Sequence, residues 1–540
     1  MKPVSKETLE LLNSLHGKEG LLDRFIGGSK KVELLRQIAE RNEPGVLSHL
    51  FPFVFDSNRA LAEEAKKAVV QLSSRLKPQD FLLLDLQIRQ FSPYFVGGGW
   101  FAINKGDLRA LKTSSQASVL LGLTSFHPNG HLREEAVLHL GECSDGRELP
   151  FLLIRLNDWV SNIRETTRRI LETRLVPAHG RHFVSNLFFL YRLKSCFRGT
   201  HEPFIASVEE LLKSQECQSV LEQGFESDDG FTRRSCLKLL LRSSGTDRVG
   251  LLKHLATHNN PVLRLIAFRE VVPELSSEAL RKALEWFDND ENPTLRREVL
   301  FYRISKFSSE VEKLLPSALL DKHPLIREIG RKEYERSGSS ASNFYRRALA
   351  VAEPKRLIGA IAGLGETGGS TDIGLIAPFL SHDKKIILRR AAVRATGKLS
   401  KDESVGHFVE LLKDGSPGVA RESRNVLVSK ASFLNAKNIW SVFENDSRGY
   451  VRKQALIVIY HLGKWDKIPF LVLACSDADE EIARMAKRYI QSWWSRYNRN
   501  SGLQPKKENL DLFQNAMNSA GQNVAPQLQR EFNSLIKSWR

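Results

Sequence analysis

A short arginine-centred motif that returns every 31 or 32 residues constrains this chain more than any other feature. In most copies an apolar residue precedes the arginine, and a small or apolar residue follows three positions later. Successive arginines are 31, 69, 31, 32, 31, 62, 32, 31 and 32 residues apart. The step of 62 spans one copy with Leu357 in the arginine position, and the step of 69 leaves room for one divergent repeat. The arginines are Arg133, Arg164, Arg233, Arg264, Arg296, Arg327, Arg389, Arg421, Arg452 and Arg484.

Each repeat contains two stretches with helical spacing. The first lies ahead of the arginine and ends at Asp, Asn, Gly or Pro, as in residues 150–158 and 373–383. The second carries the arginine, and its apolar positions −1, +3 and +7 form one face at about 100° per residue. We therefore expect helix A, a short turn and helix B, closed by a loop. No strand pattern competes, so the prediction is an all-α solenoid of about 12–14 repeats.

Aspartates stand six residues before several of these arginines, and Asp414 and Asp477 stand seven before. An aspartate there can cap helix B by accepting its free N–H groups. The arginine can reach the aspartate of a neighbouring repeat, so we interpret the two columns as an internal structural ladder rather than a ligand site. The predicted ladder consists of Arg133, Arg164, Arg264, Arg296, Arg327, Arg389 and Arg452 with Asp158, Asp290, Asp321, Asp383 and Asp446.

The pattern Asp-x₅-(Val/Ile/Leu)-Arg-x₂-Ala, with Gly at +8 or +11, is matched best around Arg133, Arg389 and Arg452. Over residues 45–500, with a poor match at 175–225, the chain resembles the short HEAT-like repeats of the phycobilisome-lyase type. The resemblance implies a right-handed α-solenoid with helices B on its concave face, used as an interaction scaffold. It transfers no catalytic residues, because the repeats carry no catalytic motif.

The repeat register divides the chain into three parts. Residues 1–115 are expected to form an irregular N-terminal cap, since terminal repeats of solenoids are atypical. Residues 116–500 are the repeat array, divergent at about 175–225. Residues 501–540 are a polar linker and two amphipathic helices, which either cap the last repeat or dock on a partner; capping is the favoured interpretation.

Composition excludes several other classes. A hydrophobic fraction of 41% rules out whole-chain disorder, and no apolar stretch is long enough for a transmembrane helix. The N-terminus does not resemble a signal peptide. Five cysteines without CxxC, and 14 histidines without HExxH, predict neither disulfides nor a metal site. We expect a cytoplasmic protein with no cofactor and no membrane partner.

Two glycine motifs have simpler interpretations than ligand binding. Gly363, Gly365 and Gly368 match GxGxxG, but the motif falls at the end of a helix B, where a dinucleotide site would need a preceding strand. The segment 97–101, GGGWF, is either a binding loop or a loop whose aromatic residues pack into the N-terminal cap.

The net charge of +17 favours an acidic partner. Residues 151–200 hold nine basic and three acidic residues, and residues 481–507 hold seven and one. Both segments also carry aromatic residues, and positions +1 and +5 of helix B add a basic stripe. The predicted partner-binding residues are Arg234, Lys238, Arg269, Arg297, Arg390, Arg394 and Lys453 of the stripe, with Trp159, Arg168, Arg169, Arg488, Trp493 and Trp494 of the segments.

Three functions compete on this evidence. The leading hypothesis is a non-catalytic scaffold that binds an acidic protein surface or peptide. The alternative is a nucleic-acid-binding protein, because basic and aromatic residues together suit single strands. An enzyme resembling the HEAT-like DNA glycosylases is the least favoured, since the chain offers only Asp158 and Trp159 toward such a site and Asp158 already has a structural role.

Overall fold

The computed structural model describes residues 3–16, 23–90, 103–351, 353, 356–401, 405–497 and 505–539. Within these ranges all regular structure is helical. The chain forms two compact units, Met1–Trp286 and Phe287–Arg540. No helix of the described ranges is both long and apolar enough to cross a membrane. The segment 97–101 lies outside the described residues.

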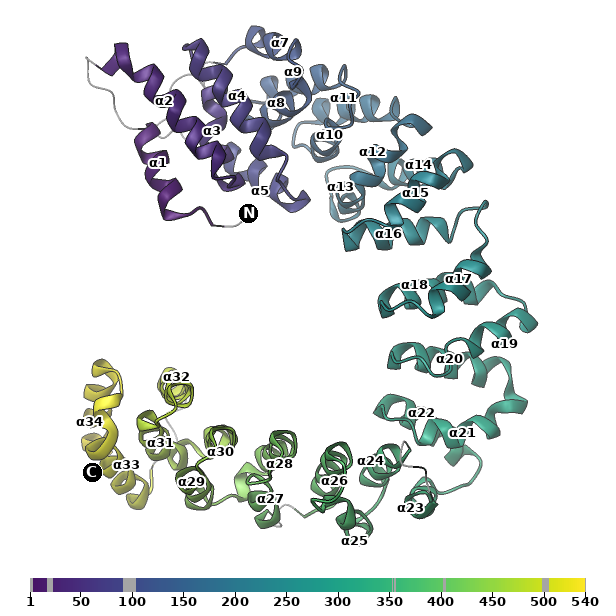
Figure 1. Ribbon diagram of the computed structural model, residues 1–540, viewed down its shortest axis with the longest axis vertical. Coiled ribbons are helices and arrows are strands. Elements are labelled where there is room, and N and C mark those ends of the chain that lie inside the picture. The colour runs from purple at the N-terminus through teal and green to yellow at the C-terminus, as the bar shows by residue number, and fades with distance from the viewer. Residues whose placement is uncertain are drawn as a thin grey trace. The chain divides into compact units, whose positions relative to one another are not determined.

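Unit 1 begins with helices α1 to α5 and continues as short helices that pack in pairs such as α8–α9 (Figure 1). Its α-helices are α1 (Lys6–His16), α2 (Asp23–Glu40), α3 (Leu47–Leu50), α4 (Arg59–Ser73), α5 (Pro78–Arg89), α7 (Lys105–Lys112), α8 (Ala117–Thr124), α9 (Gly130–Leu140), α10 (Leu149–Arg155), α11 (Ser161–Glu172), α12 (Gly180–Ser185), α13 (Leu187–Arg192), α14 (Glu202–Lys213), α15 (Gln218–Phe225), α16 (Gly230–Leu240), α17 (Arg248–Ala256), α18 (Pro261–Val271) and α19 (Ser277–Glu285).

Unit 2 contains the more regular half of the array and the C-terminal helices. Its α-helices are α20 (Pro293–Lys306), α21 (Val311–Leu319), α22 (Pro324–Arg336), α23 (Ala341–Val351), α24 (Leu357–Thr367), α25 (Ile373–Ile376), α26 (Ile386–Leu399), α27 (Gly406–Leu411), α28 (Pro417–Ser429), α29 (Ala436–Asn445), α30 (Gly449–His461), α31 (Lys464–Leu473), α32 (Glu480–Tyr497), α33 (Lys507–Ala520) and α34 (Pro526–Trp539).

The helices pack as neighbouring pairs, which is the arrangement that the 31–32-residue period predicts. Helix A packs on helix B in α8–α9, α17–α18 and α29–α30, and consecutive helices B pack in α9–α11, α26–α28 and α28–α30 (Figure 1). Buried apolar side chains of successive repeats join into continuous cores, one of them running from Leu12 to Leu240 in unit 1. Each repeat buries its apolar face against the next, as in a solenoid. The prediction of an all-α helical-repeat fold is confirmed.

The start of helix B differs in one detail from the sequence prediction. Asp158 accepts the backbone N–H of Val160 at 3.0 Å, and Asp321 accepts that of His323 at 2.7 Å. These acceptors form a turn two residues ahead of the helix, so the aspartate orders the loop rather than capping the helix. Two positions further on, Val160 and His323 make no side-chain cap for α11 and α22, whereas Asn292 caps α20 by accepting the N–H of Thr294 at 2.8 Å.

The divergent region 175–225 consists of four short helices, α12 to α15. Within it α15 packs on α16 as a helix A packs on its helix B, and α14 also contacts α16. The step of 69 residues therefore holds the helices of an additional, irregular repeat.

The GxGxxG motif serves close packing of α24 in unit 2. A Cβ at Gly363 would lie 2.2 Å from the ring of Tyr345 in α23, and one at Gly365 would lie 2.5 Å from Ala395 in α26. Gly359 approaches even closer, since its Cβ would be 1.9 Å from the carbonyl oxygen of Leu320. Gly368 ends the helix. These glycines let neighbouring helices touch α24.

The C-terminal helices complete the core of unit 2. Helix α33 packs against α31, and α34 packs against α33 (Figure 1). Phe513 and Phe532 are fully buried in the same apolar cluster as Trp493 of α32. The two helices thus cover the apolar face that the last repeat would otherwise expose.

Candidate functional site

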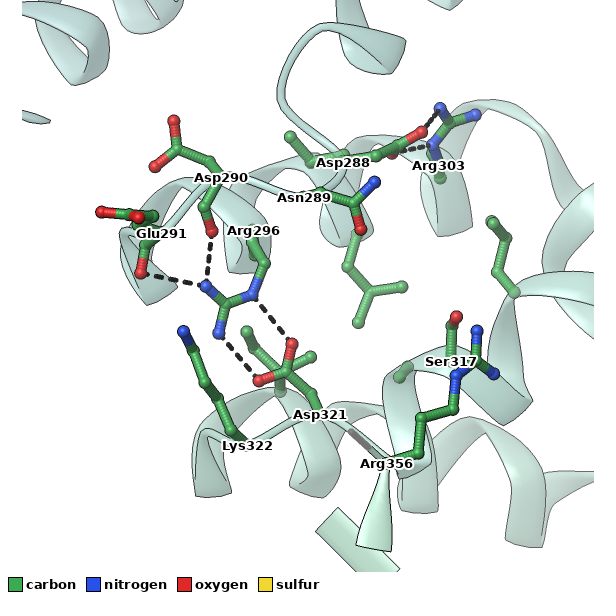
Figure 2. A pocket seen from close by; sticks show the side chains of 15 residues that line it. Asp288, Asn289, Asp290, Glu291, Arg296, Arg303, Ser317, Asp321, Lys322 and Arg356 are labelled. Carbon is green, nitrogen blue, oxygen red and sulfur yellow. Dashed lines mark hydrogen bonds and ion pairs between the residues drawn. The ribbon is translucent and has the colours of Figure 1, made fainter. Parts of the chain in front are cut away.

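The repeated arginine joins two consecutive loops. Arg296 donates to both carboxylate oxygens of Asp321 at 2.8 Å, and to the carbonyl oxygens of Asp290 and Glu291 at 2.5 and 3.1 Å (Figure 2). Arg133 holds Asp158 in the same way, and Arg452 holds Asp477. Arg389 pairs with Asp414. In each case the aspartate lies 25 residues after the arginine.

Several predicted members of the ladder have different partners. Asp383 is exposed and pairs with Lys384, because the repeat before it has Leu357 where the arginine would be. Asp446 is bound by Arg448, while Arg421 is exposed.

Two arginines also depart from the pattern. Arg327 donates to Glu366 of α24 instead of a loop aspartate. Arg164 has Phe189 at the +25 position and donates only to the carbonyl oxygens of Asp158 and Trp159. Arg264 and Asp290 are also predicted members of the ladder. Arg264 donates to the carbonyl oxygen of His258 in the loop before its helix, and Asp290 accepts the backbone N–H of Asn292.

A cavity of about 560 Å³ surrounds the Arg296–Asp321 pair in unit 2 (Figure 2). Arg303 pairs with Asp288 at 2.6 Å on its wall, and Lys322 and Arg356 also line it. Because the lining carries both acidic and basic groups, among them the ion pairs Arg296–Asp321 and Arg303–Asp288, the cavity does not select a ligand of one charge sign.

Unit 1 contains a buried ion network around Asp158. Arg133, Arg155 and Arg89 all contact this carboxylate, and Asp85 pairs with Arg155 at 2.8 Å. Burial alone would raise the pKa of Asp158, but the hydrogen bonds from Arg133 and the charge of Arg155 outweigh it and lower the pKa to about 2. Asp158 is therefore an ionised structural residue that binds three arginines, and it is not available as a catalytic acid or base.

The strongest candidate site is a groove in unit 2 between α32 and the chain segment that leads into α34. Its volume is about 720 Å³. One wall consists of side chains of α32 that repeat at helical spacing, and the other of the turn before α34. The lining residues are Arg484, Lys487, Arg488, Ile490, Gln491, Trp494, Ser495, Asn523, Val524, Ala525, Gln527 and Leu528. We call it the α32 groove.

The α32 groove has a basic rim and an apolar floor. Arg484, Lys487 and Arg488 are exposed and stand at i, i+3 and i+4, so they share one side of the helix. Arg484 lies 3.7 Å from exposed Glu480. Lys487 and Arg488 pair with no carboxylate among the described residues. Three cations above apolar side chains suit a ligand with both acidic and apolar groups.

The two adjacent tryptophans of α32, Trp493 and Trp494, have different environments in the structure. Trp494 is half-buried, lines the α32 groove and packs edge-on against Phe532 of α34. Trp493 is 5% exposed and donates its indole N–H to the carbonyl oxygen of Lys464 at 2.7 Å. Trp493 is a core residue, which corrects the expectation that it contacts a partner. It is nine residues after Arg484, which at about 100° per residue places it on the opposite side of α32 from the rim.

Part of the predicted basic stripe is neutralised by the next repeat. Arg390 and Arg394 both bind Glu422, at 2.7 and 2.9 Å, and Lys453 pairs with Glu481. The sequence prediction considered partners only within one helix, whereas these acids lie 28 to 32 residues on. These three cations are therefore weaker candidates for a partner than predicted.

The remaining stripe residues lie on α16 and α18 of unit 1 and on α20 of unit 2. Arg234 and Lys238 are exposed on α16, and Arg297 is half-buried on α20. Arg269 is exposed on α18. Arg234 lines a cavity of about 1070 Å³ together with Phe188 and Phe231.

Trp159, Arg168 and Arg169 belong to unit 1. Trp159 is 70% exposed in the loop before α11. Arg168 donates to the carbonyl oxygen of Thr200 at 2.8 Å, and Arg169 contacts the hydroxyl of Thr166 at 3.4 Å. Trp159 and Arg168 therefore lie beside the loop 196–200.

Of the residues that line the α32 groove, only Arg488 and Trp494 are among the partner-binding residues predicted from the sequence. Arg484 and Lys487 carry a signal that was available, since both stand at helical spacing from Arg488. Val524, Ala525 and Leu528 carry none, because only the packing of α33 and α34 brings this stretch beside α32.

Comparison with known proteins finds only weak structural similarities. No family model matches the chain, and no curated protein sequence matches it. Among solved structures it is similar to Kap121p, with 10% identity, 98% of this chain and 56% of that chain covered, and a TM-score of 0.30. It is also similar to importin beta, with 11% identity, 99% and 83% covered, and a TM-score of 0.26. The chain thus spans little more than half of Kap121p. Likeness at this level supports no transfer of ligands or partners.

Proposed function

We propose that this protein is a non-catalytic scaffold that binds an acidic segment of a partner protein in the α32 groove. The observation that carries the proposal is the combination of an apolar floor with a basic rim, in which Lys487 and Arg488 pair with no carboxylate among the described residues and Arg484 lies 3.7 Å from the exposed Glu480. An amphipathic segment with Asp or Glu on one side and apolar residues on the other complements both features. Helix-in-groove recognition of this kind uses apolar anchors for affinity and charges for register.

The apolar floor favours protein over nucleic acid as the ligand of this groove. Leu528 and Trp494 are half-buried, and Ala525 is exposed, so each leaves apolar surface for a partner to cover. Nucleic acid would contact the cations through its phosphates but would leave the aliphatic groups without a partner. The rest of the protein acts in this proposal as a rigid helical-repeat support.

A binding measurement with a designed peptide tests the proposal. The probe is a fluorescein-labelled helical peptide that carries glutamates on one face and leucines on the other; the comparison peptide has serine in place of leucine. We expect the full chain to bind the leucine peptide more tightly, because only that peptide fills the floor. The triple variant Arg484→Glu, Lys487→Glu and Arg488→Glu should bind it about tenfold or more weakly, since three favourable pairs become repulsive.

A matched control separates the groove from overall charge. Lys437, Lys507 and Lys537 are exposed in the same unit and do not line the groove. Their replacement by glutamate changes the net charge equally and should leave the affinity within about twofold, because exposed distant charges are screened by salt. Equal weakening by both triple variants, or equal binding of the leucine and serine peptides, would refute the groove as the site.

A further inference from the structure

Two aromatic side chains of unit 1 are exposed to solvent beside the same arginine. Trp159, in the loop before α11, is 70% exposed, and Phe197, in the loop before α14, is 84% exposed. The guanidinium carbon of Arg198 lies 5.1 Å from the centroid of the Trp159 ring and 5.3 Å from that of the Phe197 ring. One cation therefore contacts both rings, which is favourable for a guanidinium over an aromatic face.

The two loops that carry these rings are tied to each other. The backbone N–H of Arg198 donates to the side-chain oxygen of Asn157 at 3.1 Å. Arg168 donates to the carbonyl oxygen of Thr200 at 2.8 Å, and Arg164 donates to that of Trp159 at 3.1 Å. These bonds hold the backbone of the two loops in place and leave both rings exposed. An ordered pair of large exposed apolar side chains has no role in the core, and such surface marks an interaction site.

The charge around the rings selects an anionic ligand. Arg164, Arg168 and Arg198 surround them, and none of the three makes a salt bridge with a carboxylate of the described residues. The acidic residues nearest in sequence, Glu165 and Glu202, are exposed on the adjoining helices. Cations beside open aromatic faces are the combination that single-stranded nucleic acids use, with bases stacked on rings and phosphates on arginines.

We propose that Trp159, Phe197 and Arg198, with Arg168, form a binding site for single-stranded nucleic acid. We call this set the unit 1 stacking patch. Bases stack on the rings of Trp159 and Phe197, and the guanidinium of Arg198 between them binds the phosphate that links the stacked nucleotides. The patch differs from the α32 groove in its apolar surface: Trp159 and Phe197 are both largely exposed aromatic rings, whereas the groove combines one half-buried ring, Trp494, with aliphatic side chains such as that of Leu528. This inference is independent of the proposed function.

Fluorescence anisotropy with the full chain tests the patch. The probes are labelled 12-nucleotide oligo(dT) and oligo(U), a duplex of equal length, and the acidic leucine peptide. We expect both single strands to bind more tightly than the duplex, because paired bases cannot stack on the rings; a preference between DNA and RNA identifies the natural source. The double variant Trp159→Ala, Phe197→Ala should bind single strands at least about tenfold more weakly, as expected when two stacking rings are lost.

Two further variants make the result specific. Phe301 and Phe433 are 65% and 48% exposed in unit 2, so Phe301→Ala, Phe433→Ala removes the same number of exposed rings and should bind like the parent chain. Arg198→Ala should reduce the slope of log affinity against log salt by about 0.7, the value for one phosphate contact on a single strand. Because all these rings are exposed, circular dichroism should show unchanged helix content.

Three results would overturn the stacking patch. They are no binding of single strands at low salt, equal affinity for single strands and duplex, and full binding by the Trp159→Ala, Phe197→Ala variant. A loss of peptide binding in that variant, with oligonucleotide binding retained, would assign the patch to a protein ligand instead.

Discussion

At the scale of single residues, the arginine of the repeated motif contributes to stability in some repeats and is expected to contribute little in others. Arg296 is 9% exposed and binds Asp321 and two loop carbonyls, whereas Arg421, in the equivalent position, is exposed and Asp446 is bound by Arg448. The motif alone therefore does not state which arginines stabilise the fold.

Substitution of these two arginines should separate the roles. Arg296→Ala leaves Asp321 and two carbonyl oxygens without their donor, and we expect it to lower the free energy of unfolding by about 3 kcal/mol. Arg421→Ala should change it by less than about 0.5 kcal/mol. Urea denaturation followed by circular dichroism measures both. Equal effects of the two substitutions would show that the ladder does not act through its ion pairs.

Glu148 is a buried carboxyl group without a close partner. Its side chain is 0% exposed, both oxygens lack a hydrogen-bond partner among the described residues, and the nearest cation, Arg174 Nε, is 3.7 Å away. Burial raises the pKa of Glu148 to about 7 from its ordinary value of 4.5. The folded state thus holds this proton more tightly than the unfolded state.

The pH dependence of stability should reveal this carboxyl group. As pH rises from 4.5 to about 7, the carboxyl group ionises in the unfolded state while the folded state still holds the proton, so the folded state loses stability; above about pH 7 the loss is complete. Glu148→Gln cannot ionise. The free energy of unfolding of this variant, relative to the parent chain, should therefore increase by about 3 kcal/mol between about pH 4 and pH 8. Parallel pH profiles of the two chains would mean that the carboxyl group is not buried as described.

At the scale of elements, the close packing of helix α24 depends on glycines, because a Cβ at these positions would collide with neighbouring helices. Gly359→Ala places a methyl group 1.9 Å from the carbonyl oxygen of Leu320, a backbone atom that cannot move without shifting α21. We expect a loss of about 3 kcal/mol in the free energy of unfolding. Gly406 begins α27 with open space around it, so Gly406→Ala should be neutral or stabilising by up to about 1 kcal/mol. Thermal denaturation of both variants checks this; a destabilised Gly406→Ala or an unaffected Gly359→Ala would contradict it.

The elements also show how far sequence reasoning reaches. The period of the arginine motif predicts the helix pairs of α16 to α32, because each repeat buries the same positions in the same way. It does not predict the partners of Arg390 or Arg327, since these depend on acids at varying positions in the following repeats. Trp493 and Trp494 are adjacent and aromatic, and only the packing of α34 decides that one is core and the other lines the groove.

At the scale of the whole molecule, local pairs compensate much of the positive charge. The ladder and the acids that bind Arg390, Arg394 and Lys453 are examples. The cations without a carboxylate partner among the described residues include Lys487 and Arg488 of the α32 groove, and Arg168 and Arg198 of the unit 1 stacking patch. The net charge of +17 is therefore informative mainly through these two places.

The central claim is that an acidic, amphipathic protein segment occupies the α32 groove. Photo-crosslinking from position 491, which lines the groove, tests it most directly: Gln491 is replaced by a benzophenone amino acid, nuclease-treated cell extract is irradiated, and crosslinked peptides are sequenced by mass spectrometry. The account predicts crosslinks to segments with Asp or Glu and apolar residues at helical spacing, lost in the Arg484→Glu, Lys487→Glu, Arg488→Glu variant and retained in the Lys437, Lys507, Lys537 control. Crosslinked segments without acidic residues, or the same crosslinks in the groove variant, would contradict it.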